Sequence, residues 1–174
     1  MRGGELAADS SALIYIAKAD AFSRVGAIVA PLTVMPAVWY EAVTEGRRSG
    51  YPDAARIEAA NEDGWLHRAE LGASRLAHAT TVALEEGLGR GESQVIVYAA
   101  AAECGAIIDD RRAARAARAR GLVAFSTLAL GVLARRAGLP LAQSLDLLRS
   151  LAVAASARTD VLELYERRVR EEHR

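Results

Sequence analysis

Short apolar segments alternate with amphipathic segments along most of this chain, and this alternation limits the fold more than any other feature. The apolar segments have the length of strands, and the segments between them have the spacing of helices. Such alternation is typical of βαβ units, whose parallel strands form a sheet covered by helices. We therefore predict an α/β fold with a central parallel sheet of four or five strands. The expected strands lie at about residues 4–9, 31–34, 65–67, 106–108 and 122–125.

The same pattern predicts helices between the strands and only helices after the last strand. The helix expected at residues 92–103 is apolar on almost every side, so we expect it to be buried. The expected helices cover about residues 10–18, 20–29, 36 onwards, 52–61, 73–86, 92–103, 111–119, 127–137, 140–155 and 159–172.

The composition is that of one globular unit. The chain has 174 residues, 52% of them hydrophobic, and no apolar stretch reaches the length of about 18 residues that a membrane span requires. Cys104 is the only cysteine, so no internal disulfide can form and a cytoplasmic, reducing location is expected. A net charge of zero argues against nucleic-acid binding through bulk charge but allows a local basic patch.

Acidic residues lie where the expected strands give way to helices. Asp9 ends the first strand, Glu41 lies in the third helix, and Glu92 begins the alanine-rich helix. Asp110, preceded by Asp109, ends the fourth strand. The carboxyl edge of a parallel sheet is where open α/β proteins bind ligands, so these carboxylates could converge there. Two unit charges about 4 Å apart repel by roughly 4 kcal/mol at an effective dielectric near 20, which a bound cation would offset.

The residue types in this set favour a hard metal ion. Mg²⁺ and Mn²⁺ prefer oxygen ligands, and Mg²⁺ usually takes few carboxylates while keeping several waters. Histidine is absent from all of these segments, which disfavours a zinc site and a histidine general base.

The acidic residues also lie in segments that resemble a known family. Asp9-Ser-Ser-Ala-Leu-Ile resembles the opening motif of PIN-domain ribonucleases, and residues 34–41, 91–99 and 107–112 are similar to their second, third and fourth motifs. Together with residues 125–133, the fourth segment is most similar to the subgroup with Asp-Asp/Glu-Arg after strand four. The segments occur in the order and spacing of that family.

The resemblance implies a PIN-like three-layer α/β/α sandwich and Mg²⁺- or Mn²⁺-dependent hydrolysis of RNA. Many relatives are toxins of toxin–antitoxin pairs. The implied catalytic residues are Asp9, Glu41, Glu92 and Asp110, and the implied metal ligands are Asp9, Glu92 and Asp110, with Asp109 as the alternative to Asp110. Asp110 is preferred because its separation from Glu92 matches the family, and one of the two aspartates is expected to cap the next helix.

Two departures from the family pattern concern metal affinity and substrate choice. Glu92 stands where many members have aspartate, and the fourth motif lacks the Thr-x-Asp form that is common in the toxins. Each acid also has a structural alternative: Asp9 could cap a helix, Glu41 could be an exposed surface residue, and Glu92 could interact with a helix dipole.

Candidate substrate-binding residues adjoin the acids. Ser11, Ser126, Arg111 and Arg112 could contact a phosphate, although the two serines, like Ser10 and Thr127, are expected to be helix caps rather than participants. The other arginines of the fourth-motif helix are expected to form a solvated face that balances nearby acids, with phosphate binding as the alternative; they are Arg115, Arg118 and Arg120.

The C-terminal segment is purely helical in pattern. We predict a PIN-like nuclease domain at residues 1–139 and a helical extension at 140–174, packed on the same domain or at a homodimer interface. Its apolar residues at helical spacing are Leu141, Leu145, Leu148, Leu151, Val161, Leu164 and Val169. An RNA substrate and an antitoxin protein are the expected partners, with no membrane. The alternative function is a catalytically inactive PIN-like module that acts through protein or nucleic-acid binding.

Overall fold

A computed structural model describes residues 4–29 and 31–172 of the chain. The outermost residues of both expected units, 1–3 and 173–174, lie outside this description. The described elements agree closely with the periodicity of the sequence, and several helices begin or end at the expected residue.

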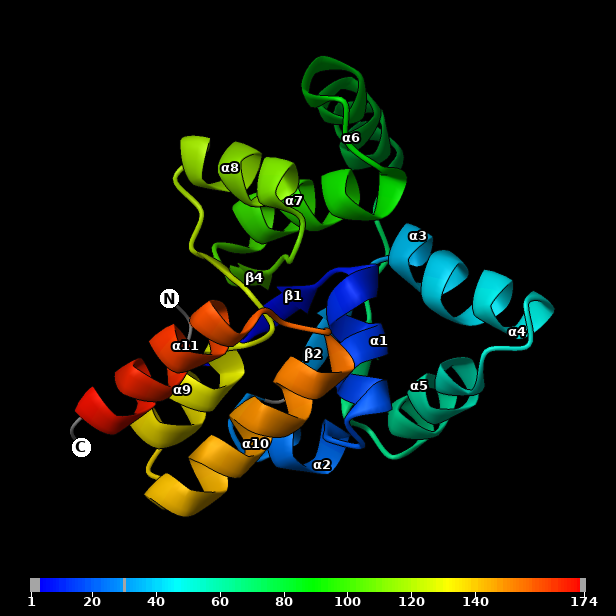
Figure 1. Cartoon of the computed structure of the whole chain (residues 1–174). Coiled ribbons are helices and arrows are strands. Elements are labelled where there is room, and N and C mark those ends of the chain that lie inside the picture. The colour runs from blue at the N-terminus through cyan, green and yellow to red at the C-terminus, as the bar shows by residue number, and fades with distance from the viewer. Residues whose placement is uncertain (1–3, 30, 173–174) are drawn as a thin grey trace.

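The centre of the molecule is a sheet of five parallel strands, as predicted (Figure 1). The strand order is β3-β2-β1-β4-β5. Two or three residues form each strand: β1 Leu6–Ala8, β2 Leu32–Val34, β3 Leu66–Arg68, β4 Gly105–Ile107 and β5 Ala124–Phe125.

The strand order reverses direction between β1 and β4. From β1 the chain adds β2 and β3 on one side, and then returns to place β4 and β5 on the other side. Ala8 pairs with Val34 of β2 and with Ile107 of β4, so the ends of the three strands are level. In open α/β sheets this reversal leaves a crevice at the carboxyl edge, where ligands bind. The residues that follow β1 and β4 therefore occupy the position most suited to a site.

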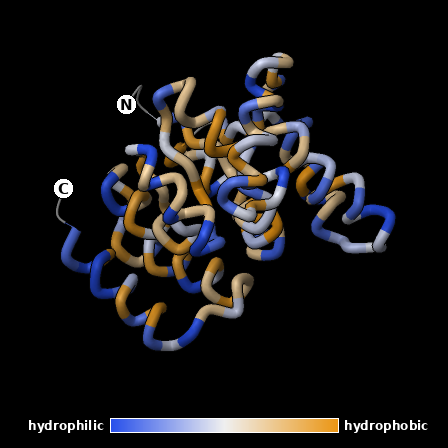
Figure 2. The backbone as a smooth tube through the Cα atoms, turned by 90° about the horizontal axis from the view of Figure 1, so that it is seen from above, coloured by the Kyte–Doolittle hydropathy of each residue, from blue (hydrophilic) through white to orange (hydrophobic). Residues whose placement is uncertain are grey.

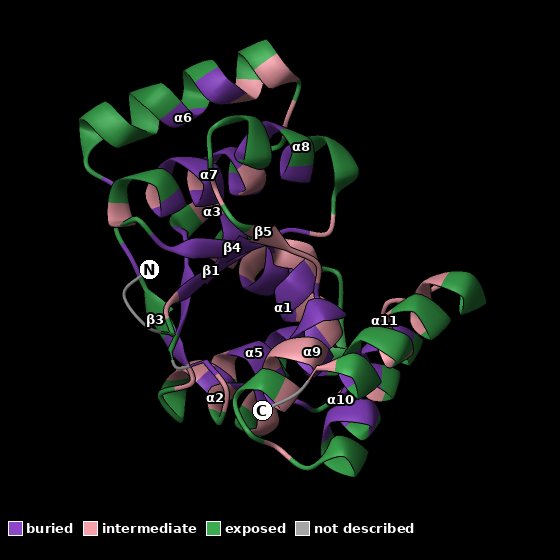
Figure 3. Cartoon of the chain, turned by 90° about the vertical axis from the view of Figure 1, so that its left-hand side faces the viewer, coloured by how far each residue is buried: buried purple, intermediate pink, exposed green. Residues whose placement is uncertain are grey.

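Helices cover both faces of the sheet, which confirms the three-layer arrangement (Figure 3). On one face α7 packs against β1 and β4, with α6 and α8 beside it. On the other face lies α1, which contacts α5 and α10. The helices are α1 Ser10–Lys18, α2 Phe22–Gly26, α3 Pro36–Trp39, α4 Gly46–Arg48, α5 Pro52–Glu62, α6 Ala73–Glu86, α7 Arg90–Ala102, α8 Arg111–Ala119, α9 Ala129–Arg136, α10 Leu141–Ala154 and α11 Thr159–Glu171.

The third expected helix has a feature that periodicity did not predict. Between α3 and α4 the chain forms a π-helical segment, η1, at Tyr40–Glu45. The wider turn of a π-helix is rare and frequently occurs at functional sites. Glu41 lies in this segment.

The C-terminal helices pack on the rest of the same chain. Helix α10 contacts α1 and α9, and α11 contacts α9 and α10. Leu148 and Leu151 are fully buried, whereas Leu141 and Leu164 remain 38% and 39% exposed. Close packing of α9 on α10 depends on Gly131, because a Cβ there would lie 2.7 Å from the Cβ of Leu148.

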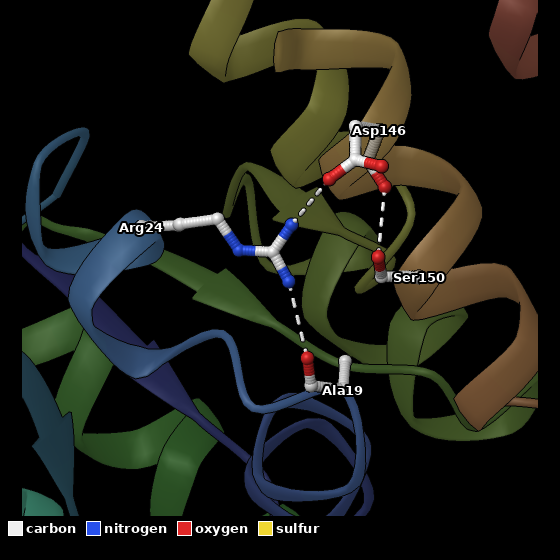
Figure 4. Close-up of polar contacts among 4 residues, drawn as sticks. All are labelled: Ala19, Arg24, Asp146 and Ser150. Atoms are coloured by element: carbon white, nitrogen blue, oxygen red, sulfur yellow. Dashed lines mark hydrogen bonds and ion pairs between the residues drawn. The ribbon is translucent and has the colours of Figure 1, made fainter.

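A polar contact joins the same extension to α2 (Figure 4). Nη1 of Arg24 donates to Oδ2 of Asp146 over 2.9 Å, and its Nη2 donates to the carbonyl oxygen of Ala19 over 3.1 Å. The Ser150 hydroxyl donates to the carbonyl oxygen of Asp146 over 2.9 Å. The carboxylate of Asp146 is largely exposed, so this pair adds little stability, about 1 kcal/mol or less, and the apolar contacts hold the extension in place.

Hydrophobic and hydrophilic residues alternate along the helices, including the last one (Figure 2). Among residues 4–29 and 31–172, no helix combines the length and the apolar character needed to cross a membrane.

Candidate active site

Asp9 lies at the reversal of the strand order, directly after β1. Its side chain is only 3% exposed. Oδ1 accepts a hydrogen bond from the backbone N–H of Ala12 over 2.8 Å, which caps α1. Oδ2 accepts one from the backbone N–H of Asp109 over 3.1 Å, so the same carboxylate joins the ends of β1 and β4. The capping alternative and the convergence of acids are thus both present at this residue.

The environment of Asp9 disfavours its charged form. Burial raises the pKa of its carboxyl from 3.8 to about 7, and the hydrogen bond from Ala12 opposes this rise. The negative charges of Asp109 and Glu92 raise the pKa further, while the N–H of Asp109 lowers it. Burial is therefore the main cause of the raised pKa of Asp9, and the charges of two acids from separate segments add to it.

The two aspartates after β4 have different positions. Asp109 is partly buried, accepts a hydrogen bond from the backbone N–H of Thr127 over 2.9 Å, and accepts another from the Thr127 hydroxyl. Burial raises the pKa of Asp109, and both bonds from Thr127 lower it. Asp110 is exposed and caps α8, since its Oδ1 accepts from the N–H groups of Arg112 and Ala113, each over 2.8 Å.

The structure places Asp109, and not the preferred Asp110, beside Asp9, while the choice between them as metal ligand stays a prediction. One aspartate caps the helix and the other faces Asp9, as expected of the pair, but the capping residue is Asp110. The physical reason is that the position directly before a helix presents its oxygen to the first free N–H groups, which leaves the preceding residue to adjoin β1. Thr127, which is completely buried, supports Asp109 and was considered only a helix cap in the sequence.

Glu41 joins three helical elements near this cluster. Its Oε2 accepts a hydrogen bond from the hydroxyl of Ser10 at the start of α1, and its Oε1 accepts one from the N–H of Gly91 in α7 over 3.2 Å. A Cβ on Gly91 would lie 2.6 Å from Oε2 of Glu41, so glycine is what allows this approach. Glu41 is exposed overall, yet it is fixed at the site side of η1. Ser10 is a contact that the sequence did not identify.

Glu92 lies in the first turn of α7. Its Oε2 accepts a hydrogen bond from the N–H of Gly89 over 2.8 Å, which is the helix-terminal role considered as its alternative. Its charge also raises the pKa of Asp9, so it belongs to the electrostatic cluster as well. These two roles are compatible because a carboxylate has several lone pairs.

The four expected substrate-binding residues lie in different surroundings and do not form one cluster. Ser11 is partly buried, and Arg112 donates to the carbonyl oxygen of Gly87 over 3.1 Å. Ser126 forms a hydrogen bond with the Tyr165 hydroxyl over 2.8 Å, which attaches α11 to the end of β5. Arg111 lines a cavity of about 660 Å³ that also reaches Asp109.

The donor chemistry of this cluster fits a magnesium or manganese ion. Asp9, Asp109, Glu92 and Glu41 offer only carboxylate oxygens, and a bound cation would stabilise the charged form of Asp9 that burial disfavours. In the described ranges, however, no three acidic, histidine or cysteine side chains already form a metal cage. Their oxygens accept hydrogen bonds from the protein instead.

Comparison with known proteins agrees with this fold. A family model described as a PIN domain matches residues 5–169, which is nearly the whole chain and includes most of α11. No curated protein matches the sequence. Because the family model covers far more than half of the chain, this protein belongs to the PIN-domain family, whose members are generally nucleases that typically use divalent metal ions.

Proposed function

We propose that this protein is a metal-dependent ribonuclease that hydrolyses phosphodiester bonds of RNA at the carboxyl edge of its sheet. The observation that carries the proposal is Asp9, a buried carboxylate at the strand-order reversal whose pKa rises to about 7 beside Asp109 and Glu92. Strongly perturbed carboxylates in such a crevice are typical of catalytic or metal-binding sites.

Each acid has a distinct place in the proposed mechanism. Asp9 would be the central metal ligand, because two N–H groups fix both of its oxygens. Asp109, oriented by Thr127, and Glu92 would hold the metal or its waters. Glu41, held by Ser10 and Gly91, would position the attacking water. When bound, Mg²⁺ or Mn²⁺ would lower the pKa of that water and neutralise charge on the phosphate.

A cleavage assay with matched variants tests the proposal. Wild-type protein should cleave RNA with Mn²⁺ or Mg²⁺ and not with EDTA, and Asp9→Asn should be inactive. Asp63→Asn is the control, because it makes the same chemical change at an exposed aspartate after α5. Isothermal calorimetry with Mn²⁺ should show binding to wild type and D63N only. Folded wild type that neither binds Mn²⁺ nor cleaves RNA would overturn the proposal and favour a non-catalytic module.

We further propose a role as the toxin of a toxin–antitoxin pair and a homodimeric state. The toxin role follows from the similarity of the acidic motifs to toxin nucleases, and the homodimer follows from the apolar residues of the C-terminal helices, of which Leu141 and Leu164 remain partly exposed. Light scattering coupled to size-exclusion chromatography measures the oligomeric state, and expression in a bacterial host tests toxicity. Growth arrest that requires Asp9 supports the toxin role, whereas normal growth with active enzyme contradicts it.

A further inference from the structure

A cavity between α8 and α11 contains an unusual concentration of arginine. Its volume is about 660 Å³, and it extends from Asp109 and Ser126 to the side chains of α11. The arginines that line it are Arg111, Arg115, Arg118 and Arg168. Asp109 is the only acid among its lining residues within the described chain, so the cavity carries an excess of positive charge.

In the part of the chain that the structure describes, these arginines have no acidic partner. Some arginines close to them in sequence do: Arg120, directly after α8, pairs with Glu86 over 2.8 Å, and Arg170 of α11 pairs with Glu166 over 3.5 Å. Within residues 4–29 and 31–172, none of the four cavity arginines forms an ion pair. Like charges gathered in this way repel, and an anionic ligand would offset that repulsion.

The arginines of α8 form a row on one face of that helix. Arg111, Arg115 and Arg118 are separated by four and three residues, which places them on successive turns. The row spans about 10 Å at a rise of roughly 1.5 Å per residue. Phosphates of one strand follow each other about every 3.4 Å along a duplex axis and further apart when extended, so the row can contact more than one of them.

The opposite wall of the cavity comes from the C-terminal extension. The Arg168 guanidinium lies 5.3 Å from the centre of the Tyr165 ring, and the Tyr165 hydroxyl bonds to Ser126. The guanidinium therefore has a fixed support beside an aromatic ring, a pairing that suits contact with both phosphate and base. On α8, Arg118 is oriented by its bond to the carbonyl oxygen of Ala124 over 2.9 Å.

We propose that this cavity, which we call the α8–α11 groove, binds the backbone of single-stranded RNA and delivers it to the carboxylates. The inference rests on the proposed function and adds an RNA-binding role for α11. A polynucleotide suits the groove better than an acidic peptide does, because the groove ends at Asp109, whose backbone N–H bonds to Asp9. Bound phosphates would therefore continue directly into the candidate site.

The test measures RNA binding separately from cleavage. Fluorescence anisotropy of a labelled oligouridylate in EDTA gives the affinity and its salt dependence. Arg115→Gln and Arg168→Gln should each weaken binding about tenfold, as expected for one lost charge-assisted contact, and lower the salt slope by about one. Arg167→Gln is the matched control, because Arg167 is the exposed neighbour of Arg168 on α11 and lies outside the groove. It should have a much smaller effect on both quantities.

The outcomes separate this inference from the ribonuclease proposal. If wild type cleaves RNA with Mn²⁺ while R115Q and R168Q bind and cleave as well as R167Q does, the groove inference is wrong and the ribonuclease proposal stands. If RNA binds through Arg115 and Arg168 but no metal supports cleavage, the RNA-binding role of the groove stands, and its delivery of RNA to a catalytic site is wrong together with the ribonuclease proposal. Binding of an acidic peptide such as polyglutamate through these arginines, without RNA binding, would overturn the inference in favour of a protein partner. Circular dichroism confirms that each variant is folded.

Discussion

At the scale of single residues, Asp9 couples the chemistry of the site to the stability of the fold. Its pKa is about 7 in the folded chain against 3.8 as the ordinary value, so the folded state binds the proton more tightly. The free energy of unfolding should therefore fall as pH rises from about 4 to about 7 without metal. One pKa unit corresponds to about 1.4 kcal/mol, and the effect is about 4 kcal/mol at most.

Asp9→Asn removes this charge and should raise the melting temperature at pH 8 in EDTA, with little change near pH 4. The variant keeps an oxygen to cap α1 but loses the acceptor for the N–H of Asp109, which offsets about 1 kcal/mol of the gain. Thermal unfolding across this pH range measures the difference, and D63N should follow wild type. A lower melting temperature for D9N at pH 8 would mean that the hydrogen bonds of the Asp9 carboxylate stabilise the fold by more than its buried charge destabilises it.

The adjacent aspartates should separate activity from stability. Asp110→Ala removes the cap of α8 and should lower the free energy of unfolding by about 1 kcal/mol, while activity per folded molecule stays near wild type. Asp109→Asn should abolish cleavage, because Asp109 adjoins Asp9. Urea unfolding and RNA cleavage give the two quantities. Cleavage that is lost in D110A but retained in D109N would restore the preference drawn from motif spacing.

The sequence could identify this pair of aspartates but could not assign their roles. Asp109 would cap the helix if α8 began at residue 110, and Asp110 caps it because α8 begins at residue 111. The spacing of the motifs does not determine the helix start to within one residue, but the identity of the capping residue depends on it. For a related reason the sequence predicts Ser10 and Thr127 to be helix caps and not site residues, since hydroxyls near helix starts usually cap helices.

At the scale of elements, the closeness of α9 and α10 depends on one glycine. Gly131→Ala would place a Cβ 2.7 Å from the Cβ of Leu148 and 3.3 Å from the carbonyl oxygen of Ser144. Overpacking of this kind costs about 1–3 kcal/mol, and the better helix propensity of alanine returns about 1 kcal/mol. We expect a net loss of up to about 2 kcal/mol in urea unfolding. Gly72→Ala, where a Cβ meets no atom within 4 Å, is the control for steric cost; because Gly72 is the N-cap of α6, where glycine is favoured over alanine, it should lose less than about 1 kcal/mol.

Helix periodicity predicted most elements correctly, because each helix buries one face against the sheet or a neighbouring helix. The expected helix at residues 73–86 and α6 Ala73–Glu86 coincide, as do residues 111–119 and α8 Arg111–Ala119. The segment η1 was missed, since a π-turn leaves the apolar pattern of a helix nearly unchanged over one turn. That turn is where Glu41 contacts Ser10 and Gly91, so the missed element belongs to the site.

At the scale of the whole molecule, the convergence of the acids follows from strand order. The sequence indicated parallel strands, and a parallel sheet places the carboxyl ends of neighbouring strands at one edge. Only the structure supplies the pairing of β1 with β4, which joins Asp9 to a residue 100 positions later. The same holds for the groove: Arg168 comes from α11, and no motif connects that helix with α8. Contacts between elements that are distant in the chain cannot be predicted from the pattern of a single sequence.

A bound metal ion should raise the free energy of unfolding, because it would stabilise the charged carboxylate of Asp9, which is unfavourable without a cation. A ligand that binds only the folded state adds RT ln(1 + [L]/Kd), about 2.7 kcal/mol at a concentration of 100 times Kd. Mn²⁺ at pH 8 should therefore raise the melting temperature of wild type and D63N, and leave D9N unchanged. Ca²⁺ at equal concentration is a control for general screening of charge, because it prefers more oxygen ligands in a larger cage. An equal rise in D9N would show that the ion binds elsewhere, and Asp9 would then be a helix cap whose buried charge serves no metal.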